Sequence, residues 1–179
     1  GALIRPDWED DLKGEETSRD AVHIAVLMFG LSDRQIIRPA PGARPFAIGS
    51  SDWRAEYGRR VERWLKVLRA RNMVVYLVGL PVMRRADIQQ QTEVINDILR
   101  EKAYLNGVRF IDMVETFQDE NGGFSQFGPD LSGARQKLRD GDGVTFTQIG
   151  NRKLAHFVER DIKRDVTQAV AERAVPLAG

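Results

Sequence analysis

Continuous apolar runs and helix-period patterns alternate along this chain. The first run, AVHIAVLMFG at residues 21–30, is rich in β-branched side chains and ends at a glycine. MVVYLVGLP at residues 73–81 and the shorter VRFIDM at residues 108–113 have the same character. Apolar runs without alternation indicate strands that are buried on both faces, as in parallel sheets. The pattern therefore predicts three buried strands.

The segments between and after these runs have the period of amphipathic helices. Ser51 or Asp52 is expected to cap the first helix, and residues 86–106 are expected to form the second. A last helix is expected from Thr147 to about residue 170. The face that the first helix should bury consists of Trp53, Tyr57, Val61, Trp64, Leu65 and Leu68.

Strands that alternate with helices predict an α/β fold, with three layers, α/β/α, around a mainly parallel sheet. The 179 residues are expected to form a single domain, 1–179. Residues 31–51, rich in proline and glycine, predict a long loop, and residues 117–133 predict a hairpin or an irregular excursion. Ligands of such sheets bind beyond the carboxyl ends of the strands, so function is expected in the loops that follow them.

Composition narrows the classes of function. The formal net charge is +1, which gives no reason to expect a nucleic-acid partner. The chain has no cysteine, which excludes disulfides, thiolate zinc sites and cysteine nucleophiles. No apolar run is long enough to span a membrane, and no signal-peptide pattern is visible in the chain.

Unusual loops follow the predicted strands. They read GLSDRQ after the first strand, GLPVMRR after the second, IDMVET after the third and DGDGVTFTQIG before the last helix. Together with ALIRPDW and GSSDWRAEYGRRV, these pieces resemble the SGNH hydrolase superfamily of GDSL-type esterases, and in particular its DUF459 family of bacterial periplasmic proteins. The resemblance covers residues 3–165. It implies a flavodoxin-like SGNH hydrolase fold and a periplasmic or extracytoplasmic location.

The resemblance also implies a catalytic arrangement, from which this chain departs. In the superfamily a Gly-Asp-Ser block supplies the nucleophile, a Gly-x-Asn-Asp block completes the oxyanion hole, and an Asp-x-x-His block supplies the base and its orienting carboxylate. Residues 30–33 match the second block with Ser32 in place of Asn, and Asp142 begins a third block that ends in Thr145. The Gly-Asp-Ser block is absent, and the resemblance implies that it lies upstream, with the first helix and two strands. No cofactor is implied.

The resemblance places five residues in a cleft: Gly30, Ser32, Asp33, Asp142 and Thr145. Ser32 is a candidate nucleophile, but an oxyanion-hole or turn-capping donor is favoured because no base is placed to activate it. Asp33 and Asp142 are interpreted as residues that cap turns and also line the cleft. A metal held by Asp33, Asp112 and Asp142 is disfavoured, because their spacing matches no known binding loop.

Three further side chains are candidates for substrate binding: Arg34, Arg84 and Trp8. Loop arginines can clamp anionic groups, although they are equally common on ordinary surfaces. Trp8 offers a plane for stacking near the expected entrance of the cleft. Neither histidine replaces the missing base. His23 in the first strand is expected to be structural, and His156 is expected near the packing face of the last helix.

Two hypotheses of function follow. The first is a divergent SGNH-type hydrolase of acyl or acetyl esters, with esters of cell-envelope glycans as the implied class. The second is a catalytically inactive SGNH-fold module that binds a glycan or an envelope partner. A flavodoxin-like nucleotide or flavin binder is disfavoured, because no glycine-rich phosphate loop joins a strand to a helix.

The apolar strand at residues 21–29 has a further implication. Without the first strand of the superfamily it would have an open edge, which native proteins avoid. We expect a homodimer, another partner, the N-terminal segment or upstream sequence to cover that edge.

Overall fold

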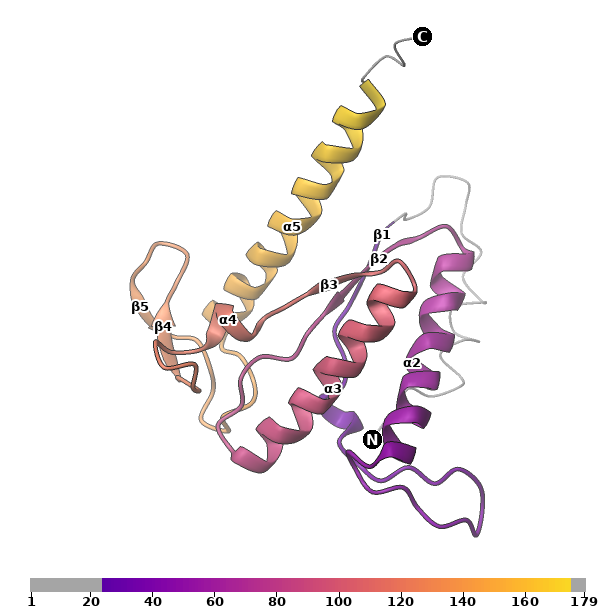
Figure 1. Cartoon of the computed structure of the whole chain (residues 1–179). Helices are drawn as coiled ribbons and strands as arrows, with labels where there is room; N and C mark the ends of the chain where they lie inside the picture. Colours follow the sequence, from indigo (N-terminus) through magenta and orange to yellow (C-terminus); the bar gives the residue numbers. More distant parts are fainter. Residues whose placement is uncertain (1–23, 175–179) are drawn as a thin grey trace. The chain divides into compact units, whose positions relative to one another are not determined.

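A computed structural model of the chain describes residues 24–174 (Figure 1). Contacts divide the chain into two compact units, with the boundary between Glu115 and Thr116, and each unit is described by itself. The single domain expected from the length and the three-layer arrangement stay predictions.

A three-stranded parallel sheet forms the centre of the first unit. Its strands are β1 (Ile24–Leu27), β2 (Val74–Val78) and β3 (Arg109–Ile111), in the order β1-β2-β3. The register places Leu27 beside Leu77, and Leu77 beside Phe110. Four of the five residues of β2 are buried, as a central strand of a parallel sheet requires. The predicted α/β fold with a parallel sheet is confirmed.

Helices α2 (Ser51–Ala70) and α3 (Ala86–Leu105) pack against each other and against the sheet (Figure 1). The prediction that Ser51 or Asp52 caps α2 is wrong by one residue or two. Ser50 has the extended backbone of an N-cap, and its hydroxyl accepts a hydrogen bond of 3.2 Å from the N–H of Trp53. The α2 residues with at most 2% exposure are Trp53, Tyr57, Val61, Leu65 and Leu68.

The first strand lies at one edge of this sheet, and β2 is the only strand that it pairs with among residues 24–174. It is shorter than the apolar run predicted, and residues 21–23 lie outside the described part. Val26 is 46% exposed and Met28 41% exposed, although both belong to the run predicted to be buried. The cover expected over this edge stays a prediction.

The second unit contains a hairpin and the longest helix. The short helix α4 (Val114–Phe117) runs across the boundary into this unit. Strands β4 (Phe127–Pro129) and β5 (Arg135–Lys137) then form an antiparallel pair. This hairpin begins inside the predicted region 117–133 but ends beyond it, whereas a single antiparallel bridge joins Gln118 to Phe124 within the region. Helix α5 (Gln148–Ala174) follows.

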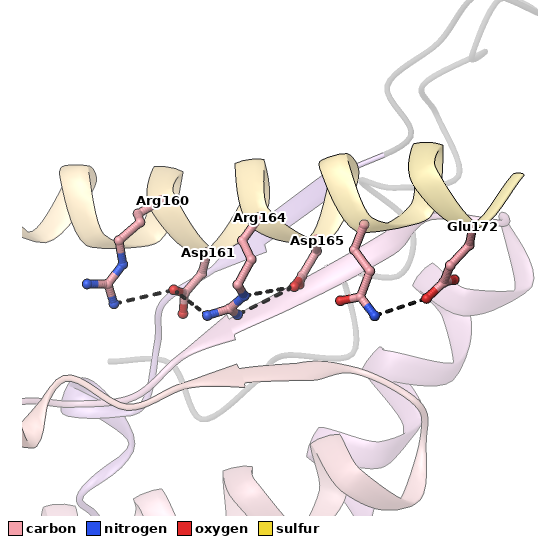
Figure 2. Close-up of polar contacts among 6 residues, drawn as sticks. Arg160, Asp161, Arg164, Asp165 and Glu172 are labelled. Carbon is pink, nitrogen blue, oxygen red and sulfur yellow. Dashed lines mark hydrogen bonds and ion pairs between the residues drawn. The ribbon is translucent and has the colours of Figure 1, made fainter. Parts of the chain in front are cut away.

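Side-chain contacts between near neighbours cover one side of the C-terminal half of α5 (Figure 2). Arg164 lies between two aspartates, 3.3 Å from one and 3.4 Å from the other. Both aspartate side chains are largely covered, at 18% and 12% exposure, whereas Arg164 is 60% exposed. Pairs within one helix typically stabilise it by a few tenths of a kcal/mol each. The pairs are Arg160–Asp161, Arg164–Asp161, Arg164–Asp165 and Gln168–Glu172. No helix within residues 24–174 is long and apolar enough to cross a membrane.

Candidate functional site

Gly30 opens the turn that follows β1. Its φ is 118°, in a region that side-chain-bearing residues rarely adopt, and a Cβ there would lie 2.8 Å from Cγ2 of Ile95. The chain then enters η1 (Leu31–Asp33), a single 3₁₀ turn closed by a 2.9 Å hydrogen bond from the N–H of Asp33 to the carbonyl of Gly30. Backbone angle and space therefore both require glycine at position 30.

This turn buries Asp33 and exposes Ser32. Asp33 is 2% exposed, and its Oδ2 accepts a 2.8 Å hydrogen bond from the hydroxyl of Tyr57. Burial raises the pKa of Asp33 to about 6, against the opposing effects of the Tyr57 bond and the Arg60 charge. Burial and the neighbouring carboxylate also raise the pKa of Tyr57 well above its ordinary value. The exposed hydroxyl of Ser32 has no hydrogen-bond partner within the described part of the chain.

Two aromatic residues of α2 hold this turn in place. Trp53 and Tyr57 are one helical turn apart, and their rings stack with centroids 4.8 Å apart and planes at 15°. The indole N–H of Trp53 donates a 2.8 Å hydrogen bond to the carbonyl of Gln35. The N–H of Gln35 donates in turn to the carbonyl of Asp33, at 2.8 Å. Helix α2 therefore contacts the turn both at Asp33 and two residues beyond it.

Arg34 ties the same turn to α3. Its Nε donates to the carbonyl of Leu31 at 2.9 Å, and one terminal nitrogen donates to Oε1 of Gln91 at 3.2 Å. This half-buried guanidinium is thus partly engaged in holding the loop. Arg84, the second predicted substrate contact, is exposed, and Trp8 lies outside the described residues.

The segment after β2 is fixed by a buried amide. Asn96 of α3 accepts a 2.8 Å hydrogen bond from the N–H of Leu80 and donates another of 2.8 Å to its carbonyl. Gly79 precedes it, where a Cβ would lie 2.6 Å from the ring of Phe110. One side chain therefore satisfies both the N–H and the carbonyl of Leu80. Leaving these buried backbone groups without hydrogen bonds would destabilise the fold.

In the second unit, Thr145 is hydrogen-bonded to Asp142 through its backbone N–H and its hydroxyl. Oδ1 of Asp142 accepts hydrogen bonds of 2.9 Å from the N–H groups of Val144 and Thr145. The Thr145 hydroxyl lies 2.7 Å from Oδ2 of Asp142 and 3.2 Å from Oδ2 of Asp140. The backbone bonds from Val144 and Thr145, followed by the hydroxyl bond, lower the pKa of Asp142. Asp142 is thus an ionised carboxylate that caps its own turn.

Arg139 supports this loop from inside the second unit. It is fully buried, with its guanidinium carbon 5.1 Å from the ring centroid of Phe124 and 4.7 Å from that of Phe146. One terminal nitrogen donates a 2.8 Å hydrogen bond to the carbonyl of Val144. A cation held between two rings therefore anchors the loop that contains Asp142.

The loop continues into α5 through a close backbone approach. Thr147 caps the helix, because its hydroxyl accepts a 3.1 Å hydrogen bond from the N–H of Gly150. A Cβ at Gly150 would lie 2.0 Å from the carbonyl oxygen of Leu138, so only glycine fits there. Leu138, Thr147 and Gly150 thus fix the start of α5 relative to the strand that leads into the loop.

The remaining candidates take other roles. Asp112 pairs with Arg100 at 3.0 Å and accepts the N–H of Val114 at 2.8 Å. No group of three or more His, Cys, Asp or Glu residues that could hold a metal ion occurs within residues 24–174. His156 is exposed, so its expected place near the packing face is wrong; its ring lies against Phe157, with centroids 5.6 Å apart. His23 lies outside the described residues.

The structure adds three residues that the sequence did not indicate: Tyr57, Asn96 and Arg139. The helical spacing of Tyr57 predicts a buried ring, and a buried tyrosine hydroxyl usually has a hydrogen-bond partner, which is a usable signal for a polar contact. Asn96 lies among apolar helix positions, which is the usual sign of a satisfied buried amide. The charged sequence around Arg139 gave no sign of burial.

Comparison with known proteins shows the family of the chain. A family model described as "Protein of unknown function (DUF459)" matches residues 3–161, and the chain belongs to this family. The family indicated by the sequence motifs is thus confirmed. No curated protein matches the chain.

Two solved structures are similar to the chain. One is a GDSL-like lipase from Bacteroides thetaiotaomicron, with a TM-score of 0.47, 15% identity, and coverage of 63% of this chain and 53% of that one. The other, named as an acylhydrolase, is from Bacteroides fragilis, with a TM-score of 0.47, 15% identity, and coverage of 63% and 52%. The chain spans about half the length of these structures.

Each unit can supply one kind of chemistry. In the first, a fixed turn presents the Ser32 hydroxyl, which can donate a hydrogen bond to a carbonyl oxygen. In the second, Asp142 is a carboxylate whose nearest side-chain partner is a hydroxyl. A serine nucleophile needs a base to take its proton, and neither threonine nor an ionised aspartate with a lowered pKa is an effective base near neutral pH.

Proposed function

We propose that this protein binds acyl or acetyl esters, with esters of cell-envelope glycans as the class, and that it does not hydrolyse them with the groups found in residues 24–174. The observation that carries the proposal is the 2.7 Å hydrogen bond between the Thr145 hydroxyl and Oδ2 of Asp142. By its motif, Asp142 corresponds to the carboxylate that orients a catalytic imidazole in the superfamily. Thr145 corresponds to the histidine of that motif, and its hydroxyl has no basic character near neutral pH.

The ester specificity is supported by Ser32. By its motif, Ser32 corresponds to the asparagine that donates to the oxyanion in the superfamily, and it is exposed on a turn held by two helices. A hydroxyl in this position can donate to the carbonyl oxygen of a bound ester. Because that bond forms with the ground-state carbonyl as well as with an oxyanion, it contributes to binding without requiring turnover.

The test uses the full-length protein and a matched pair of ligands. We would measure binding of an O-acetylated oligosaccharide and of its deacetylated form by calorimetry, and follow acetate release by NMR. The proposal expects tighter binding of the acetylated form and no release of acetate. Equal affinity for the two forms would reject ester recognition, and steady acetate release would reject the non-catalytic assignment.

Hydrolysis is the second candidate, and the preorganised turn at residues 30–33 favours it. Donors fixed before the reaction are what an oxyanion hole requires, and they are typically worth a few kcal/mol in the transition state. A fluorophosphonate probe reacts with activated serines. A mapped adduct on the wild-type protein would establish this candidate, whereas labelling that appears only in Thr145→His would show a scaffold that lacks one group.

We also propose an extracytoplasmic location, which the family resemblance supports. Fractionation of cells that express the tagged full-length protein tests this, with a cytoplasmic marker as the control. Recovery with that marker would reject the proposal.

A further inference from the structure

The side chain of Asp33 links the Ser32 turn to the interior of the first unit. Ser32 and Asp33 are adjacent, yet the first is exposed and the second is 2% exposed. Within residues 24–174, the only hydrogen bond of the Asp33 carboxylate comes from Tyr57, at 2.8 Å. This contact therefore ties the turn to α2, while Arg34 ties it to α3.

The packing around Tyr57 holds its side chain in one position. It is fully buried, and the stacked ring of Trp53, with centroids 4.8 Å apart, fixes one of its faces. Trp53 also donates to the carbonyl of Gln35 at 2.8 Å. Because both aromatic residues belong to one helix, α2 holds the turn at two points, and Ser32 lies just before the first of them.

We propose that Asp33 and Tyr57 are positioning residues, whose hydrogen bond fixes the Ser32 hydroxyl in the orientation that an ester carbonyl requires. The role of Ser32 in this inference rests on the proposed function, whereas the link between Asp33 and the turn does not. The bond is strongest when Asp33 is ionised, since charge-assisted hydrogen bonds are shorter and stronger than neutral ones. Protonation of Asp33 weakens the bond and loosens the turn.

This link makes the turn sensitive to pH near the pKa of Asp33, about 6. The ionisable groups that act on this carboxyl are Tyr57 and Arg60, both from α2, and Arg60 is itself paired with Glu56 at 2.8 Å. At Gly30, the nearest atoms of α3 and of the segment after β2 belong to the apolar side chains of Ile95 and Leu80. The response is therefore assigned to Asp33 and its α2 partners.

The first experiment follows the turn itself by NMR, without any ligand. The carboxyl carbon of Asp33 and the amide of Ser32 should titrate together near pH 6 in the wild-type protein. In Tyr57→Phe the midpoint should move to higher pH, because the lost bond is one that lowers the pKa of Asp33. The amide of Gln35 should exchange about tenfold faster, as expected for one lost hydrogen bond.

Tyr104→Phe is the matched control, because Tyr104 is 86% exposed on α3. It should leave the midpoint and the exchange rate unchanged. Asp33→Asn keeps an acceptor for Tyr57 and removes the titration, so its Ser32 amide should show no midpoint near pH 6, and it serves if Tyr57→Phe does not fold. The inference would be overturned if the chemical shift of the Ser32 amide changed neither with the protonation of Asp33 nor with these substitutions.

The second experiment adds the O-acetylated oligosaccharide. Its affinity should fall as the pH drops through the Asp33 midpoint, and the midpoint of that fall should shift in Tyr57→Phe as it does in the NMR titration. If the coupling is present but the oligosaccharide does not bind, the proposed function fails while the positioning link stands. If it binds with an affinity that is unaffected by Asp33 protonation, the positioning role for the ligand fails.

Discussion

Replacing Asp33 by asparagine should stabilise this protein at neutral pH. The ordinary pKa of the aspartate is 3.8, and burial raises it to about 6 in the folded chain. A group whose native pKa is raised holds its proton more tightly when folded. An acid of this kind therefore lowers stability as the pH rises from about 4 to about 6, and the full cost remains at higher pH.

The shift sets an upper limit on that cost. One pKa unit corresponds to about 1.4 kcal/mol, so a shift of about two units gives about 3 kcal/mol at neutral pH. Asparagine carries no charge and can accept the Tyr57 bond, but its buried NH₂ group needs a partner, which offsets part of the gain. We expect a net gain of about 2 kcal/mol, equivalent to a rise in Tm of roughly 4–8 °C.

The assay is urea denaturation followed by tryptophan fluorescence, at about pH 7.5 and at about pH 4. The gain of Asp33→Asn should be present at the higher pH and should nearly vanish at the lower. Asp97→Asn is the control; its exposed pair with Arg100 at 3.2 Å should contribute well under about 1 kcal/mol. A loss of stability at about pH 7.5 that is larger than at about pH 4 would refute the reasoning, because the native carboxylate would then be favoured.

Three further substitutions test the loop of the second unit. Gly150→Ala should lower the free energy of unfolding by about 1–3 kcal/mol, because its Cβ would lie 2.0 Å from the Leu138 carbonyl oxygen. The loss is expected although alanine usually favours a helix. Thermal unfolding measures it, and an unchanged Tm would contradict the close approach. Gly141→Ala, with no atom within 4 Å of its Cβ, is the neutral control. Arg139→Lys should lower the free energy of unfolding, measured by urea denaturation, by about 2 kcal/mol, because an ammonium cannot reproduce a guanidinium between two rings. Unchanged stability would show that only the positive charge matters. Thr145→Val should raise the pKa of Asp142, measured by carboxyl NMR, because one of the bonds that lower it is lost; an unchanged titration would mean that the backbone bonds alone set it.

Burial patterns are the reason that much of the first unit could be predicted. Short continuous apolar runs bounded by glycine and proline are typical of buried strands, and β2 follows from that rule. The buried face of α2 that contains Tyr57 and Leu65 follows from helical spacing. The cap at Ser50 was missed because three successive residues can all cap a helix, and only backbone geometry selects one. The exposed Val26 and Met28 show the limit of the same rule, since an apolar side chain is buried only where something covers it.

The candidate site was harder to predict, because its supports are distant in sequence. Residues 30–33 and Asp142 were found from short motifs, but a motif does not say which of its polar side chains points inward. That Asp33 is buried while Ser32 is exposed depends on Tyr57, which lies 24 residues away. Arg139 is buried because Phe124 and Phe146 lie against it, and only the folded loop brings those rings together.

The amide of Asn96 also determines which residues this position can accept. Its side chain accepts a hydrogen bond from the N–H of Leu80 and donates one to the Leu80 carbonyl. A neighbouring strand would satisfy the same two backbone groups, and here a helix side chain does so. Aspartate has the same size but no donor when ionised, and leucine has neither group. Glutamine has both groups on a stem that is one methylene too long for a packed interior. Asparagine is therefore nearly the only amino acid that position 96 of α3 can accept.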